Sequence, residues 1–319
     1  MNMKFEKLRS EVEELFNNRI IRLILKIILL PLFFLLKLFP FKKFHIDHLE
    51  IVVGSKCTLH CKRCANLMQY YVRPVEFPLA ELKADCLKLL ELDICFDCVH
   101  LIGGEPLLYK GLPELITLLN DSGKVKSIRV ITNGTIVPSN SLLKYLQLSK
   151  VHVLISNYIN IGAKTNEVYQ FLKKSGVDTR ITTAAWFNYH HNFSGYNRSP
   201  EELKKTYSSC CVACHEMLNG EIHLCPTSAH GMYLGLIPRD ENSFVSIRHN
   251  GSKQEKRKVT SQLKQLLNQQ IPNACDYCSG NNGELVPVAE QLPAGTYLDS
   301  HGCIISTPKT VSAKSVDNN

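Results

Sequence analysis

The alternation of short apolar runs with helical patterns between residues 45 and 200 constrains the fold of this chain more than any other feature. Runs typical of strands occur at 49–53, 99–102, 128–132, 151–156 and 179–183. Helical spacing of apolar residues occurs between them, at 79–92, 111–122, 139–148 and 163–176. This alternation predicts parallel strands joined by crossover helices, and so an α/β fold with either a doubly wound sheet or a β/α barrel.

Cysteine usage and charge narrow the classes of function. The 319 residues include 13 cysteines in short-spaced groups, without the pattern of a cleaved signal peptide. This favours a reducing compartment and metal ligation over a disulfide framework. The net charge is +8, but residues 1–44 hold nine Lys and Arg against four Glu, so most of the surplus lies there. The remaining body is mildly basic, and we expect no nucleic-acid partner.

Residues 1–44 contain an apolar stretch at 20–41. On a helix, four basic residues fall within about 60° of one another, and Leu, Ile and Phe occupy the rest of the circumference. They are Arg19, Arg22, Lys26 and Lys37. One charged face favours a helix that lies in the membrane surface, with a spanning helix and a buried helix of a soluble protein as alternatives. We expect a cytoplasmic protein, peripheral on the inner face of the cell membrane through residues 19–41.

Three cysteines follow the first predicted strand closely. Cys57, Cys61 and Cys64 have C-x3-C-x2-C spacing on what should be a loop at the carboxyl ends of the strands. A [4Fe–4S] cluster takes four ligands, so three thiolates leave one iron open to an outside chelator. Structural zinc, with His60 as a fourth ligand, is the alternative.

Polar residues also end the next three predicted strands. Gly103-Gly104-Glu105 ends the second, Thr132-Asn133-Gly134 the third and Ser156-Asn157 the fourth. Because the carboxyl ends of parallel strands meet at one mouth, these groups should face the cysteine loop. The glycines would let the backbone approach a ligand, and the Glu105 carboxylate suits an ammonium group.

The order and spacing of these motifs resemble the radical S-adenosylmethionine (radical SAM) superfamily over about residues 48–200. The resemblance implies a partial (β/α)6 barrel, with S-adenosylmethionine on the open iron and a reductant such as flavodoxin or ferredoxin. A 5′-deoxyadenosyl radical would then abstract hydrogen from a substrate. By the same resemblance Gly103, Gly104 and Glu105 would hold the methionyl ammonium, and Asn133, Ser156 and Asn157 would contact ribose or methionine. Arg63 departs from the aromatic residue or His that many members carry before the third cysteine.

The C-terminal third loses the strand–helix rhythm and is rich in cysteine. Asn219-Gly220 predicts the turn of a β-hairpin within 217–225, and a helix is expected at about 251–268. The cysteines resemble the twitch extension, a half-length relative of the SPASM domain. This resemblance implies one auxiliary [4Fe–4S] cluster on Cys225, Cys275 and Cys278, completed by Cys210, Cys211 or Cys214. A zinc knuckle is the alternative.

The predicted domains are a membrane-associating segment at 1–44, the core at 45–200, the extension at 201–295 and a tail at 296–319. The aromatic and polar run at 186–198 suits either a sugar or peptide site near the mouth or a loop packed on the extension. Cys95 and Cys98 have metal spacing but lie where the second strand begins, and we expect a structural role. Cys86 and Cys303 are expected to be inert.

The favoured function is a radical enzyme acting on an unidentified substrate, for which the membrane segment suggests a glycan or its lipid-linked precursor. Maturation of a ribosomally made peptide and a non-catalytic iron–sulfur or zinc protein are the alternatives. Fold and cofactor do not name the substrate.

Overall fold

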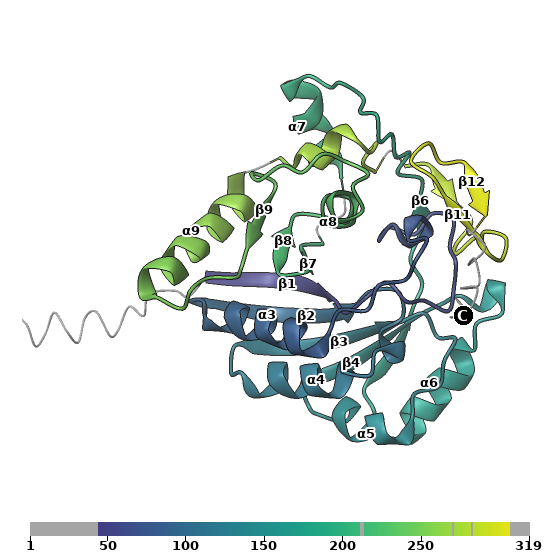
Figure 1. The fold of residues 1–319 in the computed structure, drawn as a ribbon. Helices are drawn as coiled ribbons and strands as arrows, with labels where there is room; N and C mark the ends of the chain where they lie inside the picture. Colours follow the sequence, from purple (N-terminus) through teal and green to yellow (C-terminus); the bar gives the residue numbers. More distant parts are fainter. Residues whose placement is uncertain (1–43, 211–213, 270, 282, 307–319) are drawn as a thin grey trace, which may run out of the picture. The chain divides into compact units, whose positions relative to one another are not determined.

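The computed structural model describes residues 44–210, 214–269, 271–281 and 283–306. Its main sheet has the strand order β5-β4-β3-β2-β1-β7-β8-β9 (Figure 1). The strands are β1 (Phe44–Val52), β2 (Ile94–Ile102), β3 (Val125–Thr132), β4 (Val151–Ser156), β5 (Thr179–Thr182), β7 (Glu216–Leu218), β8 (Glu221–His223) and β9 (Phe244–Ser246). Strands β1 to β5 are parallel neighbours in chain order, as the strand–helix alternation predicts.

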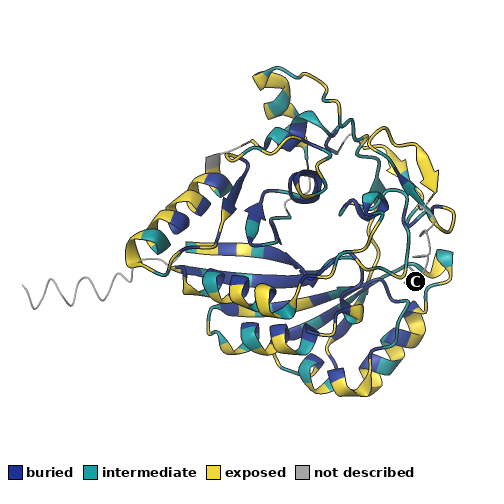
Figure 2. Cartoon of the chain, viewed as in Figure 1, coloured by how far each residue is buried: buried dark blue, intermediate teal, exposed yellow. Residues whose placement is uncertain are grey.

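Four helices connect these parallel strands and cover one face of the sheet (Figure 1). They are α3 (Leu79–Glu91), α4 (Leu112–Asp121), α5 (Asn140–Leu146) and α6 (Thr165–Lys174). Apolar strand residues such as Leu49, Leu101 and Val130 form one buried core with Leu89 and Leu115 of the helices. The helices are exposed on the side away from the sheet (Figure 2). The predicted α/β class with a partial barrel is therefore confirmed, because each crossover helix buries its apolar stripe on the same face.

The sixth strand of the expected (β/α)6 repeat does not join the main sheet. Strand β6 (Trp186–Phe187) pairs instead with β10 (Leu285–Val286). The other edge of β1 is taken by β7, which runs parallel to it. The partial barrel thus consists of five successive parallel strands extended by the C-terminal third of the chain.

The predicted hairpin and helix of the C-terminal third are confirmed. Strands β7 and β8 pair in an antiparallel hairpin whose turn residues, Asn219 and Gly220, have φ of 49° and 76°. Positive φ at both positions matches the I′ turn that Asn-Gly favours. The remaining helices are α7 (Pro200–Ser209), α8 (Pro226–Tyr233) and α9 (Lys253–Gln269), with short 3-10 turns η1 (Met68–Tyr70), η2 (Pro106–Leu108), η3 (Ile159–Ile161) and η4 (Asn273–Asp276).

Residues 296–306, which the sequence assigns to the tail, form part of the folded structure. Strands β11 (Thr296–Leu298) and β12 (Ile304–Ser306) pair as a hairpin, and the Tyr297 ring packs edge-on against His60 at 4.6 Å. The rest of the predicted tail, residues 307–319, and the membrane segment at 19–41 lie outside the described residues. No described helix is both long and apolar enough to cross a membrane.

Candidate functional site

The three cysteines of the C-x3-C-x2-C motif line one cavity of about 320 Å³. Strand β1 ends at Val52, so the loop that carries them lies at the carboxyl ends of the parallel strands. The lining also includes Gly103 and Gly104 after β2, Asn133 after β3 and Ser156 at the end of β4. The tertiary structure therefore brings together the motifs that the sequence places at four successive strand ends.

The two glycines after β2 allow two backbone segments to lie unusually close. A Cβ on Gly104 would stand 2.2 Å from the carbonyl oxygen of Lys56, and one on Gly103 the same distance from that of Gly54. The backbone N–H of Gly104 donates to Gly54 at 2.9 Å, and that of Glu105 donates to Lys56 at 2.7 Å. Because Gly103 and Gly104 have no side chains, the cysteine loop can approach the end of β2 closely enough to form these backbone hydrogen bonds. The same lack of side chains leaves space for a ligand.

Glu105 has a different environment from the one that the motif suggests. Its side chain is buried and does not line the cavity. The carboxylate accepts hydrogen bonds from the backbone N–H groups of Asn133 at 2.8 Å and Leu107 at 3.0 Å. Burial raises the pKa of this carboxyl group, while the hydrogen bonds from Asn133, Leu107 and Thr132 oppose the shift. The Glu105 carboxylate therefore holds the backbone at the end of β3 and at the start of η2 by accepting hydrogen bonds from it.

Asn133 connects its strand end to the cysteine loop. Its side-chain amide donates to the hydroxyl of Thr58 at 2.9 Å and lies 3.5 Å from the sulfur of Cys57. The Thr58 hydroxyl is also 2.5 Å from that of Thr135. Asn133 was predicted to contact S-adenosylmethionine, and the structure adds a contact with a cysteine sulfur that spacing alone does not reveal.

Ser156 and Asn157 diverge at the end of β4. Ser156 lines the cavity and hydrogen-bonds Tyr158, which lines it too. Asn157 instead donates through its side chain to Thr183 at 3.1 Å and is not among the lining residues. Of the two candidates, Ser156 is the one that faces the cavity.

A segment near the C-terminus covers the cysteine loop. Glu290 forms ion pairs with Arg63 and with Lys62, the latter at 3.3 Å. The backbone N–H of Leu292 donates to the carbonyl of His60 at 2.8 Å. Arg63, which departs from the family pattern, thus serves to hold this segment. No local sequence signal indicated that residues 290–292 lie beside the cysteines.

The three thiols have high pKa values. Burial, opposed by hydrogen bonds, raises the pKa of Cys57 to about 11 and that of Cys61 to about 12, and it also raises the pKa of Cys64. A reactive nucleophilic cysteine needs a lowered pKa, so these thiols do not suit covalent catalysis. They become thiolates when a metal centre compensates their charge.

The spacing of the sulfur atoms distinguishes between kinds of metal centre. Zinc binds thiolates at about 2.3 Å, which puts tetrahedral sulfurs about 3.8 Å apart. No three cysteine sulfurs of the described residues lie within 4.8 Å of one another. A four-iron cluster is wider than a single ion, so its ligand sulfurs stand further apart, and N–H groups near the sulfurs of Cys57 and Cys61 suit its negative charge.

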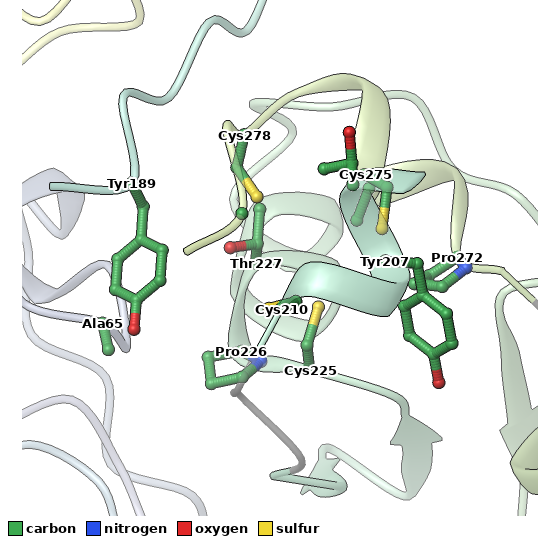
Figure 3. A pocket seen from close by; sticks show the side chains of 13 residues that line it. Ala65, Tyr189, Tyr207, Cys210, Cys225, Pro226, Thr227, Pro272, Cys275 and Cys278 are labelled. Atoms are coloured by element: carbon green, nitrogen blue, oxygen red, sulfur yellow. The ribbon is translucent and has the colours of Figure 1, made fainter. Parts of the chain in front are cut away.

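Four other cysteines surround a second, smaller pocket of about 30 Å³ (Figure 3). They are Cys210, Cys225, Cys275 and Cys278, which come from the end of α7, the start of α8, η4 and the loop after it. The N–H of Ser228 points to the sulfur of Cys225 at 3.4 Å. Burial raises the pKa of Cys225 and that of Cys275, the latter to about 12. The same spacing argument disfavours a single zinc ion here.

Cys214 does not join these four. It lies beside the carboxylate of Glu50, and burial raises its pKa to about 12. Cys211 lies outside the described residues. Cys86 is buried in the core and Cys303 is exposed.

The two halves of the aromatic run at 186–198 lie in different surroundings. Trp186, Phe187 and Tyr189 line the cavity. Further along, the Arg198 guanidinium donates to the carbonyls of Cys275 at 2.6 Å and Cys278 at 3.0 Å. The first half of this run thus borders the cavity and the second half packs on the extension, while a sugar or peptide site stays a prediction.

Comparison with known proteins agrees with this geometry. Residues 51–188 match the family model of the radical SAM superfamily. This part of the chain is therefore a radical SAM domain. The radical SAM domain includes all three cysteines of the first motif and every strand end of the cavity.

Curated relatives match less than half of the chain. The GTP 3′,8-cyclase of Peptoclostridium acidaminophilum is 28% identical over 140 residues, which cover 41% of this chain and 42% of that protein. The GTP 3′,8-cyclase of Helicobacter pylori (strain HPAG1) is 30% identical over 115 residues, 35% of each chain. The chain thus spans less than half the length of these relatives.

The matches to solved structures cover a larger share of the chain than those to the curated relatives. The crystal structure of BtrN in complex with AdoMet and 2-DOIA has a TM-score of 0.47 and 16% identity, and covers 82% of this chain and 100% of that one. Streptococcus suis SuiB bound to S-adenosylmethionine has a TM-score of 0.35 and 19% identity, over 46% of this chain and 35% of that one.

Proposed function

We propose that this chain is a radical SAM enzyme that reductively cleaves S-adenosylmethionine and acts on a substrate held in the cavity beside the cysteine loop. The observation that carries the proposal is the meeting of Cys57, Cys61 and Cys64 at one cavity, with sulfurs too far apart for a single zinc ion. When bound, the cluster and S-adenosylmethionine supply a 5′-deoxyadenosyl radical for hydrogen abstraction. The protein supplies three thiolates and one open coordination position.

The residues around the cluster site have separable roles. Asn133 lies against Cys57 and Thr58, Glu105 holds the backbone of Asn133, and Gln291 approaches Cys61. The side chains of Ser156 and Tyr158 offer hydroxyl groups to a ligand in the cavity. Trp186 and Tyr189 bring aromatic rings to the same space. These groups suit an organic ligand with both polar and ring-shaped parts.

Reconstitution with iron and sulfide under anaerobic conditions tests this proposal. With dithionite as reductant, the protein should convert S-adenosylmethionine to 5′-deoxyadenosine and methionine. Replacing Cys57, Cys61 or Cys64 by Ala should abolish this, whereas the control Cys303→Ala, at an exposed position, should not. Product formation that persists in the three variants contradicts the assignment, and bound iron without any cleavage indicates a non-catalytic iron–sulfur protein.

We further propose an auxiliary [4Fe–4S] cluster on Cys210, Cys225, Cys275 and Cys278. The support is their arrangement around one pocket and their spacing, which disfavours a zinc knuckle. Four protein thiolates leave no open iron, which suits electron transfer and a net oxidation of the substrate. The intact protein should bind about eight irons, and the variant lacking the first three cysteines about four.

Two variants test the ligand set of the second cluster. The double variant Cys275→Ala/Cys278→Ala should keep about four irons. It should still cleave S-adenosylmethionine, but slowly. Cys214→Ala is the matched control, because its thiol lies beside Glu50 and outside the four-cysteine pocket. Zinc without iron in the variant lacking the first three cysteines contradicts the auxiliary cluster.

We propose membrane attachment through residues 19–41 on the basis of the sequence, because four basic residues share one face of an apolar stretch. The full chain should fractionate with membranes, while a chain that begins at Phe44 should not. Release by alkaline carbonate supports a helix in the membrane surface, and retention in the pellet favours a spanning segment.

A further inference from the structure

Three potential metal ligands lie on the sheet face opposite helices α3 to α6. Strand residues alternate between the two faces, so residues two apart point the same way. Leu49 and Leu101 are in the core with the helices, which places His48, Glu50 and His100 on the other face. Glu50 on β1 pairs in register with His100 on β2. Two neighbouring strands, which are rigid elements, thus present two imidazoles and one carboxylate to the same space.

The three side chains are already close together. The Nδ1 atom of His100 is 3.2 Å from Oε1 of Glu50, and the rings of His48 and His100 stack with centroids 5.2 Å apart. One ligand atom from each residue lies within 4.8 Å of the other two, a grouping that no other set of His, Cys, Asp and Glu in the described ranges achieves. A metal ion bound here would replace the hydrogen bond between His100 and Glu50, because metal ligands are deprotonated.

The surroundings leave one side of this group open. Glu50 is 8% exposed and His100 9% exposed, and Ile46 and Phe96, further toward the start of the same face, are buried. Glu50 also lines the cavity that holds Cys57, Cys61 and Cys64. The group is therefore buried on its strand-start side and borders the cavity at Glu50.

We propose that His48, Glu50 and His100 bind a single divalent transition-metal ion whose open position faces the cavity. Two imidazole nitrogens and one carboxylate oxygen form a ligand set that zinc and ferrous iron accept, and three protein ligands with an open position are typical of catalytic rather than structural sites. The ion would bind an oxygen or nitrogen atom of the ligand in the cavity. That role rests on the proposed radical SAM function, whereas the binding of the metal does not.

Neighbouring groups are compatible with a bound cation. Arg129, which is exposed, lies 3.4 Å from Nε2 of His100, on the other side of the ring from Glu50. The thiol of Cys214 lies beside Glu50, where it can add one sulfur ligand.

Zinc is the probe for the test, because it differs from the iron of the clusters. The full-length protein, reconstituted with iron and sulfide, is loaded with Zn²⁺, desalted and analysed by mass spectrometry for both metals. We expect about one zinc per chain at this site, with a first shell dominated by nitrogen and oxygen at about 2.0–2.1 Å in X-ray absorption at the zinc edge.

Substitution assigns the zinc to its ligands. His48→Ala and His100→Ala should each lose this zinc and keep their iron, which reports that the fold is intact. The control His152→Ala changes a histidine on β4 that is paired with Asp178, and it should retain the zinc. If His100→Ala loses its iron as well, the variant His48→Gln replaces it in the test, because His48 is partly exposed. This variant should lose the zinc and keep its iron.

Three results overturn the proposal: no zinc in the parent protein, zinc retained in both histidine variants, or a shell of sulfur alone at about 2.3 Å. Zinc bound through nitrogen and oxygen without cleavage of S-adenosylmethionine leaves the metal site standing and refutes the proposed radical function instead.

Discussion

The side-chain amide of Gln291 donates to the sulfur of Cys61 at 3.2 Å, although 230 residues separate the two in the chain. The carbonyl oxygen of the same amide accepts from the backbone N–H of His60 at 2.7 Å. One side chain from the C-terminal extension thus contacts both a candidate cluster ligand and the backbone of its loop. Hydrogen bonds to ligand sulfurs tune the potential of iron–sulfur centres.

Replacing Gln291 by Leu tests this contact. An N–H group stabilises the more negative, reduced form of a cluster, so its loss should lower the reduction potential, by roughly tens of millivolts. A potentiometric titration followed by electron paramagnetic resonance measures the shift. Gln265→Leu, on the exposed side of α9, is the control. Equal potentials in the two variants would mean that the amide does not act on the cluster.

The close approach after β2 predicts a severe effect of Gly104→Ala. The new Cβ would stand 2.2 Å from the Lys56 carbonyl oxygen, and neither backbone segment can yield without moving the cysteine loop. We expect a loss of stability of about 3 kcal/mol or more, together with loss of about four irons. Gly123→Ala is the control, because a Cβ there meets open space and costs only its positive φ, about 1 kcal/mol. Urea unfolding and iron analysis provide the measurements, and normal iron in Gly104→Ala would be incompatible with the role of this glycine.

Glu105→Gln separates a positioning role from direct binding of the methionyl ammonium. The Glu105 carboxylate accepts two backbone N–H groups, and an amide can offer only one acceptor oxygen to them. If Glu105 is a positioning residue, the Glu105→Gln protein should therefore lose about 1–3 kcal/mol of folding stability, and its affinity for S-adenosylmethionine should fall less than ten-fold. Unchanged stability with a larger loss of affinity would favour direct binding. Glu76→Gln, at an exposed ion pair with Lys56, is the control for calorimetry of unfolding and ligand binding.

Glu221 predicts a pH-dependent contribution to stability. Burial alone would raise the pKa of Glu221, but hydrogen bonds from His223 and Arg239 hold it at about 2, below its usual value of 4.5. Because the folded-state pKa is depressed, this contribution is complete above about pH 4.5 and is lost as the pH falls toward 2. Arg239→Gln should therefore destabilise the protein at pH 7 by less than about 1 kcal/mol, since the pair is partly exposed.

The same comparison near pH 2.5, close to the folded-state pKa of Glu221, should give a smaller difference between the parent protein and Arg239→Gln. Urea midpoints at the two pH values provide the measurement. Arg257→Gln on α9 should show no such change with pH. A difference that stays constant from pH 7 to pH 2.5 would exclude Glu221 as its source.

The residue pattern alone predicted the local features correctly. Apolar periodicity indicated all five parallel strands and their helices, because burial of one face imposes it on consecutive residues. Asn219-Gly220 identified the hairpin turn, since few residues adopt positive φ in succession. The spacing of Cys57, Cys61 and Cys64 placed three thiols on one loop. Each of these features depends on residues that are close in the chain.

Only the tertiary structure decided contacts between distant segments. It places Gln291 on Cys61, turns Glu105 toward the backbone of Asn133 rather than the cavity, and puts Cys214 beside Glu50 rather than among the other four cysteines. It also pairs β6 with β10 and β1 with β7. These outcomes depend on the paths of long connections and on competition for hydrogen-bond partners, which no local pattern of residue types encodes.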